Sequence, residues 1–120
     1  MGGVPVLRLS GEVDIASVAR LRPTWLELAD ATAPALVVVD LAGVTFMDVA
    51  GLGLLVGLRN RLQQHGGQVH LRHVPDRVSK LMELTGLAGL FPVERTPRQR
   101  TPGPVIDLRL LEDEPQVRDL

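Results

Sequence analysis

The chain is organised around Val44–Leu58, which reads V-T-F-M-D-V-A-G-L-G-L-L-V-G-L. A short apolar strand that ends at Phe46-Met47 runs into Asp48, and a helical pattern follows. The Asp48 carboxylate can cap that helix, because it can accept backbone N–H groups that helix geometry leaves unpaired. The first turn, Val49-Ala50-Gly51, then lies at the positive end of the helix dipole, which favours anions. We therefore expect this turn to belong to the functional site.

The helix that follows Asp48 has an apolar stripe and a first half that is apolar nearly all round. The stripe consists of Gly51, Leu54, Leu55, Leu58 and Leu62, and the sequence His65-Gly66-Gly67 predicts a glycine C-cap. Leu52 and Val56 lie off the stripe. They either pack against a neighbouring helix or form an exposed apolar patch for a partner.

The segments before this helix read as strand, helix and strand. Val4–Ser10 alternates weakly and predicts a strand, and residues 11–14 a turn. Ala35–Val39 is continuously apolar, which indicates a strand covered on both faces, and Asp40 ends it. Ala42-Gly43 predicts a bend before Val44. The helix between these strands carries its apolar stripe on Val18, Leu21, Trp25 and Leu28.

The start of that first helix is ambiguous. Ser17 is a plausible N-cap, but Pro23 falls well inside the apolar stripe and removes a helix hydrogen bond. Either the helix is kinked at Pro23 or it begins later in the sequence. The pattern does not decide between them.

After Gly67 the chain continues as strand, helix and short strand. The pattern predicts a strand over Gln68–Val74, with Val69 and Leu71 inward, and a helix from Pro75-Asp76 to Gly86. Phe91-Pro92-Val93 fits an edge strand at most. The alternation of strands and helices predicts one α/β domain over residues 1–93, with a mostly parallel four- to five-stranded sheet and helices packed against it.

From Glu94 onward the composition changes to a Pro-rich segment, which we expect to be a weakly ordered tail over residues 94–120. Within it Val105–Leu111 alternates briefly. That segment is either a strand added to a sheet edge or a partner-binding tail.

Composition excludes several classes of function. With a net charge of −1 and only one Trp and two Phe, the chain lacks the basic patch and stacking platforms of nucleic-acid binding. Without cysteine it has no disulfide, thiol nucleophile or thiolate ligand. No signal peptide and no apolar run long enough to span a bilayer are visible. We therefore expect a cytoplasmic protein with no direct membrane insertion.

Carboxylates follow several strands, but they do not form a recognisable catalytic set. Glu12, Asp14, Asp40 and Asp48 have no Ser–His couple and no lysine close in sequence. His70 and His73, three apart on a strand, are expected to face opposite sides and so not to share a metal. No glycine-rich phosphate loop precedes a helix. We expect no enzyme activity, no cofactor and no metal.

Four segments of this sequence resemble the STAS domain, the fold of bacterial anti-sigma factor antagonists and of the cytoplasmic tails of sulphate transporters. The segments are S-G-E-V-D (Ser10–Asp14), L-V-V-V-D-L (Leu36–Leu41), V-T-F-M-D-V-A-G-L-G (Val44–Gly53) and V-S-K-L-M-E-L-T-G-L (Val78–Leu87). In antagonists of that family, the residue before the glycine of D-S-S-G or D-T-S-G is a serine. A kinase-type anti-sigma factor phosphorylates it, and the phosphorylated form releases that partner.

This chain departs from that pattern at the serine position, where it has Ala50 preceded by Val49. The resemblance implies a regulator of transcription that binds a kinase-type anti-sigma factor and is not switched at the usual place. The alternative is a STAS module that assembles a larger complex, such as a stress-signalling assembly or a lipid-transport ATPase. The expected partner-binding residues are Asp14, Asp48, Val49, Ala50, Gly51, Leu52 and Val56. The hydroxyls of Thr45, Ser17 and Ser10 remain as alternative phosphorylation sites.

Overall fold

The computed structural model of this chain describes residues 4–32, 35–94 and 102–109. Along the chain it has β1 (Val4–Val13), α1 (Ile15–Thr32), β2 (Leu36–Met47), α2 (Val49–Gln63), β3 (Gln68–Arg72), α3 (Asp76–Leu84), the 3₁₀ helix η1 (Ala88–Leu90), β4 (Val93–Glu94) and β5 (Pro102–Arg109). The five strands form one parallel sheet in the order β4-β3-β2-β1-β5. The predicted α/β fold with a mostly parallel sheet is confirmed.

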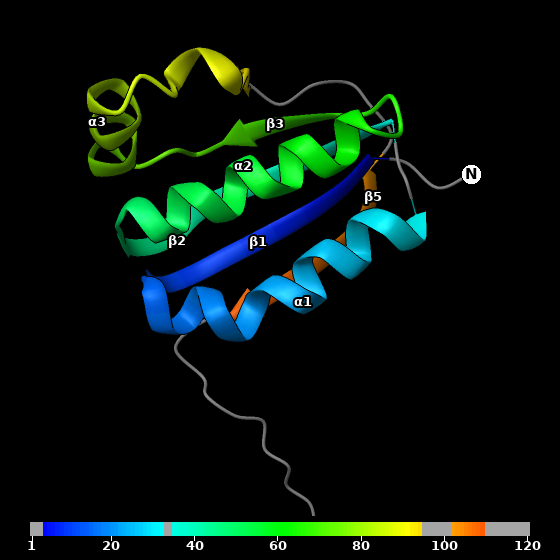
Figure 1. The fold of residues 1–120 in the computed structure, drawn as a ribbon, viewed down its shortest axis with the longest axis horizontal. Coiled ribbons are helices and arrows are strands. Elements are labelled where there is room, and N and C mark those ends of the chain that lie inside the picture. Colours follow the sequence, from blue (N-terminus) through cyan, green and yellow to red (C-terminus); the bar gives the residue numbers. More distant parts are fainter. Residues whose placement is uncertain (1–3, 33–34, 95–101, 110–120) are drawn as a thin grey trace, which may run out of the picture.

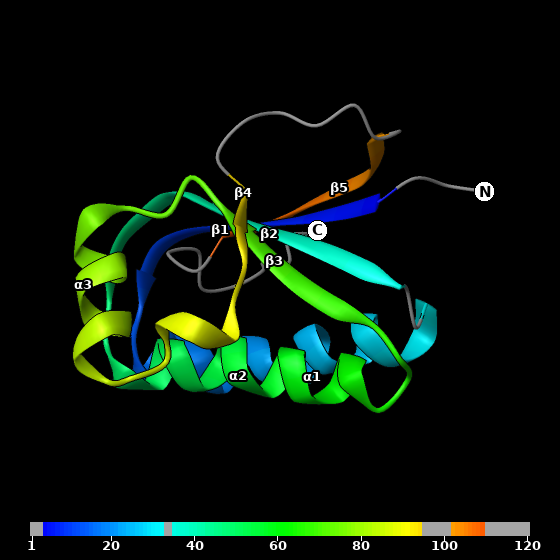
Figure 2. The same cartoon turned by 90° about the horizontal axis from the view of Figure 1, so that it is seen from above.

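Helices α1 and α2 lie side by side across the sheet (Figure 1) and cover the same face of it (Figure 2). The prediction that the strand Ala35–Val39 is covered on both faces is confirmed for Val37, Val38 and Val39, which are 4%, 2% and 0% exposed, although α1 and α2 lie on one face. Val38 is buried on the face opposite the main core. Val37 and Val39 alternate with it and are buried in the main core.

The main core lies between the sheet and the two long helices. Val18, Leu21 and Trp25 of α1 are buried, as the stripe predicts, and the Trp25 indole N–H donates to the carbonyl of Leu54 at 3.1 Å. The side chain of Leu28 lies outside the described residues. The predicted stripe of α2 is confirmed, because Gly51, Leu54, Leu55, Leu58 and Leu62 are all buried. Burial of each leucine stabilises the fold by about 1.5–3 kcal/mol.

The start of α1 differs from its prediction. The helix begins at Ile15 and is capped by Asp14, so Ser17 is not the N-cap and the hypothesis of a later start beyond Pro23 is wrong. Pro23 lies inside the helix on its exposed side. The predicted glycine ends of α2 and α3 are confirmed: Gly66 and Gly86 have φ of 79° and 77°.

Strand β2 is longer than the sequence pattern suggests. It runs without interruption through Ala42-Gly43, where we expected a bend, and the irregularity appears instead as a shift in its register with β1. A Cβ at Gly43 would lie 2.8 Å from the Cβ of Ser10, which explains the glycine. Asp40 is therefore inside β2 and does not end the strand.

The C-terminal segment is part of the sheet. Strand β5 pairs with β1 in parallel, with Val4 opposite Pro102 and Ser10 opposite Arg109. Of the two alternatives for this segment, the edge strand is the one observed. Pro102–Arg109, which was predicted to lie in a tail after the domain, is therefore part of the domain's sheet. Residues 95–101 and 110–120 of the predicted tail lie outside the described residues. At the other edge, β4 is the short strand predicted near Phe91–Val93, displaced to Val93–Glu94.

Candidate functional site

The two long helices begin at the same end of the sheet, where β1 and β2 end (Figures 1 and 2). At the β2–α2 junction, Asp48 is the N-cap, as predicted. Its carboxylate accepts the backbone N–H groups of Ala50 at 2.9 Å and Gly51 at 3.3 Å. The cap fixes the first turn of α2, so that Val49 and Ala50 are held in one conformation at the helix N-terminus.

The β1–α1 junction is built in the same way around Asp14. The Asp14 carboxylate accepts the Ser17 N–H at 3.0 Å, and the Ser17 hydroxyl oxygen accepts the Asp14 N–H at 3.0 Å, which is a reciprocal capping box. The Ser17 hydroxyl also donates to the Glu12 carbonyl at 2.8 Å. The hydrogen bond from the Ser17 backbone lowers the pKa of Asp14, so this carboxylate stays charged.

The two junctions are joined directly. The Asp48 N–H donates to the Val13 carbonyl at 3.2 Å, which links the end of β1 to the start of α2. Gly51 is packed into this link: a Cβ there would lie 2.6 Å from Met47 Cγ and 2.9 Å from the Val13 carbonyl oxygen. The two turns are therefore in close contact at Gly51, through the Val13 carbonyl and the Met47 side chain.

The first helical residue of each turn is a β-branched aliphatic residue exposed to solvent. Ile15 is 72% exposed and Val49 is 64% exposed, each next to a capping aspartate. Ala50 is half-buried against the core. We call Asp14, Ile15, Asp48, Val49 and Ala50 the two-turn surface. Ile15 was missed from the sequence; its signal is its place directly after a capping aspartate, which matches that of Val49.

Part of the predicted binding set is buried. Leu52 is 1% exposed and Gly51 is also buried, so the prediction that Leu52 provides surface contact to a partner is wrong. Leu52 points into the core because the start of α2 is pressed against β1 and β2. Val56 is half-buried and packs against the same core. For both residues, packing accounts for their apolar character.

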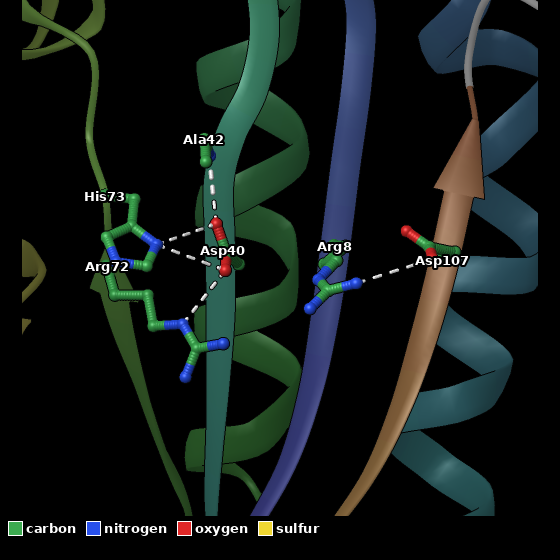
Figure 3. A network of polar contacts seen from close by, with 6 residues as sticks. All are labelled: Arg8, Asp40, Ala42, Arg72, His73 and Asp107. Atoms are coloured by element: carbon green, nitrogen blue, oxygen red, sulfur yellow. Dashed lines mark hydrogen bonds and ion pairs between the residues drawn. The ribbon is translucent and has the colours of Figure 1, made fainter. Parts of the chain in front are cut away.

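Asp40 belongs to a separate cluster on the sheet face that the helices leave uncovered. Its carboxylate accepts the Ala42 N–H at 2.9 Å and pairs with Arg72 at 3.0 Å and His73 at 3.3 Å (Figure 3). Burial raises the pKa of Asp40, but these hydrogen bonds outweigh it and hold the pKa below its ordinary value. The structure therefore does not bring Asp40 to the two-turn surface.

The histidines do not lie as predicted. Strand β3 ends at Arg72, and His73 has a φ of 55°, which turns its ring toward Asp40. His70 contacts Glu94 at 2.9 Å and Gln68 at 3.1 Å. Both histidines therefore lie on the uncovered face, and the prediction of opposite faces is wrong because the strand ends between them.

The described residues hold neither a metal-binding cluster nor a membrane-spanning helix. Within residues 4–32, 35–94 and 102–109, no three metal-ligating side chains gather closely enough to hold a metal ion. Among the described helices, none has the length and apolar character needed to cross a bilayer. At the starts of α1 and α2, Ile15 and Val49 expose apolar side chains next to the capping aspartates Asp14 and Asp48.

Comparison with known proteins shows the family to which this fold belongs. The family model of the STAS domain matches residues 1–99, and the chain belongs to that family. An anti-sigma-B factor antagonist from Staphylococcus aureus (strain NCTC 8325 / PS 47) is 34% identical over 88 residues, which cover 72% of this chain and 80% of that protein. The anti-sigma-B factor antagonist of Bacillus subtilis (strain 168) is 30% identical over 87 residues, which cover 72% and 78%.

Solved structures share the fold. The anti-sigma factor antagonist SpoIIAA in its unphosphorylated form aligns with a TM-score of 0.68 and 24% identity, over 80% of this chain and 83% of that chain. The STAS domain of a SulP transporter from Vibrio cholerae aligns with a TM-score of 0.63 and 21% identity, over 78% and 73%. At these identities, the structures show that the architecture is that of a STAS domain.

Proposed function

We propose that this chain is an anti-sigma factor antagonist that binds a kinase-type anti-sigma factor through the two-turn surface, without a phosphorylation switch at Ala50. The observation that carries the proposal is the position of Ala50 in the capped first turn of α2. In the family that this chain resembles, a serine there is phosphorylated; alanine has no hydroxyl, but it has the small, uncharged side chain of the unphosphorylated state.

The surroundings support the same proposal. A phosphate at this position would add about −1.5 to −2 charges beside Asp48 and Asp14, which is the physical basis of release in a switched antagonist. With alanine, Ile15 and Val49 remain available to a partner at all times. Of the other hydroxyls considered, Ser17 is 4% exposed and fully engaged in the capping box, so it is inaccessible to a kinase.

The test is binding of a purified kinase-type anti-sigma factor from the source organism, measured by calorimetry. Ala50→Asp places a carboxylate on the two-turn surface and should weaken binding at least tenfold, while helix formation tolerates an acid in the first turn. Leu84→Asp is the matched control, because it puts the same charge on α3 at a side chain that is 82% exposed; its affinity should equal that of the wild type.

Addition of ATP should leave the wild-type complex intact. Release by ATP would contradict the permanent-binding proposal, and equal affinities of wild type and Ala50→Asp would place the interface elsewhere. The second candidate is the assembly module. Stable association with a transporter ATPase or a larger multimer in a native pull-down, and none with the anti-sigma factor, would favour it.

A further inference from the structure

Phe46 exposes an aromatic ring close to the two-turn surface. It is 45% exposed, although Val44 and Met47 on either side of it in β2 are buried in the main core. Its partner in the register with β1 is Glu12, which is also exposed. The next pair, Val13 and Met47, faces the core, and successive strand residues point to opposite faces of a sheet. Phe46 and Glu12 therefore lie on the face opposite α1 and α2.

A β-bulge turns this ring outward. Gly11 of β1 is opposite Val44. The next residue of β1 is opposite Phe46, so Thr45 is an extra residue in β2. Val44 is buried in the core, and uninterrupted alternation would send Phe46, two residues further on, to the same side. Because the extra residue reverses that alternation, the exposure of Phe46 is built into the pairing of the two strands that lead to the two-turn surface.

The ring and the two turns are close along both strands. Phe46 precedes the capping Asp48 by two residues, as Glu12 precedes the capping Asp14. The Ser17 hydroxyl, which completes the cap of α1, also donates to the Glu12 carbonyl at 2.8 Å. A partner that covers the two turns would therefore also meet the Phe46 ring and the carboxylate beside it.

The chemistry of this position suits recognition by another protein. The accessible part of the Phe46 ring is not in the core, whereas a pocket on a partner would remove it from water. Aromatic side chains that fill such pockets provide much of the affinity of protein interfaces. The carboxylates of Glu12, Asp14 and Asp48 lie nearby along the chain, so basic groups would be favoured at the rim of that pocket.

We propose that Phe46 is the apolar anchor of the partner interface. Its ring inserts into an apolar pocket of the kinase-type anti-sigma factor, and the rim of that pocket carries a basic side chain that faces the Glu12 carboxylate. This inference rests on the proposed function, because it extends the same interface from the two-turn surface, around the end of β2, to the opposite face of the sheet.

The test is calorimetric binding of the same purified anti-sigma factor to the full-length protein and four variants. Phe46→Ala and Phe46→Thr remove the ring, and threonine keeps a residue that favours strands. Glu12→Gln removes one carboxylate. Val105→Ala is the matched control, because Val105 is 50% exposed and pairs with Val6, near the start of β1 and away from the helix starts. Urea unfolding of each free variant verifies that it is folded.

Both Phe46 variants should bind about 10- to 100-fold more weakly than the wild type, and Val105→Ala within about twofold of it. Glu12→Gln should bind about three- to tenfold more weakly at low salt, and this difference should shrink at high salt.

Wild-type affinity in the folded Phe46 variants would overturn the anchor. If Ala50→Asp still weakened binding, the proposed function would stand without it, whereas wild-type affinity in both Phe46→Ala and Ala50→Asp would contradict both proposals. A loss in Val105→Ala as large as that in Phe46→Ala would reflect exposed apolar area in general and would also overturn the anchor. Unchanged affinity of Glu12→Gln at low salt would remove the basic rim from the proposal.

Discussion

Two aspartates of similar chemistry have different roles in this molecule because of where their carboxylates lie. Asp48 is half-buried and caps a helix, and among the described residues the backbone N–H groups of Ala50 and Gly51 donate to it. Asp40 is 5% exposed inside β2 and is satisfied by an arginine, a histidine and a backbone N–H. Removal of the buried Asp40 carboxylate leaves those donors without an acceptor, whereas at the half-buried Asp48 water can replace the cap in part.

Asp40 makes stability depend on pH in a direction that follows from its pKa. Because the folded-state pKa is lowered, the contribution of this carboxylate is fully present above the unfolded-state value of about 4. It is lost as pH falls from there through the lower folded-state pKa. Asp40→Asn should therefore be less stable than the wild type at pH 7, and the difference should shrink at pH 3.

Urea unfolding of both proteins at the two pH values measures this effect. A stability difference that is the same at pH 7 and pH 3 would mean that the charge of Asp40 does not contribute. His73 is 61% exposed, so its side chain can be removed as a comparison with little loss of packing.

At the scale of elements, helix α2 has one glycine on its buried face and one on its exposed face, and the space around them differs. Gly51 lies where the helix start touches β1 and β2, and a Cβ there would meet Met47 and Val13 at 2.9 Å or less. Gly53 lies on the exposed face, with no atom within 4 Å of a Cβ built on it. The first glycine is required by packing, and nothing in the structure explains the second.

The two glycines therefore predict opposite effects of the same substitution. Gly51→Ala should destabilise the fold by about 1–3 kcal/mol, because the added methyl group overpacks the joint between the two turns. Gly53→Ala should stabilise it by about 0.5–1 kcal/mol, since alanine loses less backbone entropy in a helix. Urea denaturation of both variants checks the signs, and a stabilising Gly51→Ala would contradict the close contact.

At the scale of the whole molecule, the parallel sheet brings the residues of the two-turn surface together. Parallel strands place their carboxyl ends, and the helix starts that follow them, at one edge. Asp14 and Asp48 are 34 positions apart in sequence and become neighbours through this topology. The proposed loss of switching depends on a single side chain of the resulting surface, Ala50.

If the absence of a hydroxyl at Ala50 is what removes phosphorylation control, a single substitution should restore that control. Ala50→Ser places a hydroxyl at the half-buried second position of α2, and a kinase-type anti-sigma factor with ATP should then phosphorylate it and release the complex. Intact-mass spectrometry detects the added phosphate, and binding before and after ATP detects the release. Wild-type protein is the control and should show neither. A phosphorylated Ala50→Ser protein that stays bound would separate the turn from the interface.

Local patterns in the sequence were enough to predict the alternation of strands and helices, the apolar stripes of α1 and α2, and the Asp48 cap. These features are local: they depend on residue spacing of three to four, on a capping side chain and on glycines such as Gly66 and Gly86. The same local rules led to errors wherever a distant segment decided the outcome, as at Asp40, Leu52 and the strand Pro102–Arg109.

Those three outcomes follow from tertiary packing, because each depends on what packs against the residue. Asp40 remains inside β2 because Arg72 and His73, more than thirty positions away, satisfy its charge. Leu52 is buried because α2 presses on β1, and Ile15 is exposed because no described segment covers the start of α1. A pattern within one segment carries no information on the distant segment that covers it, whereas the folded sheet brings both together.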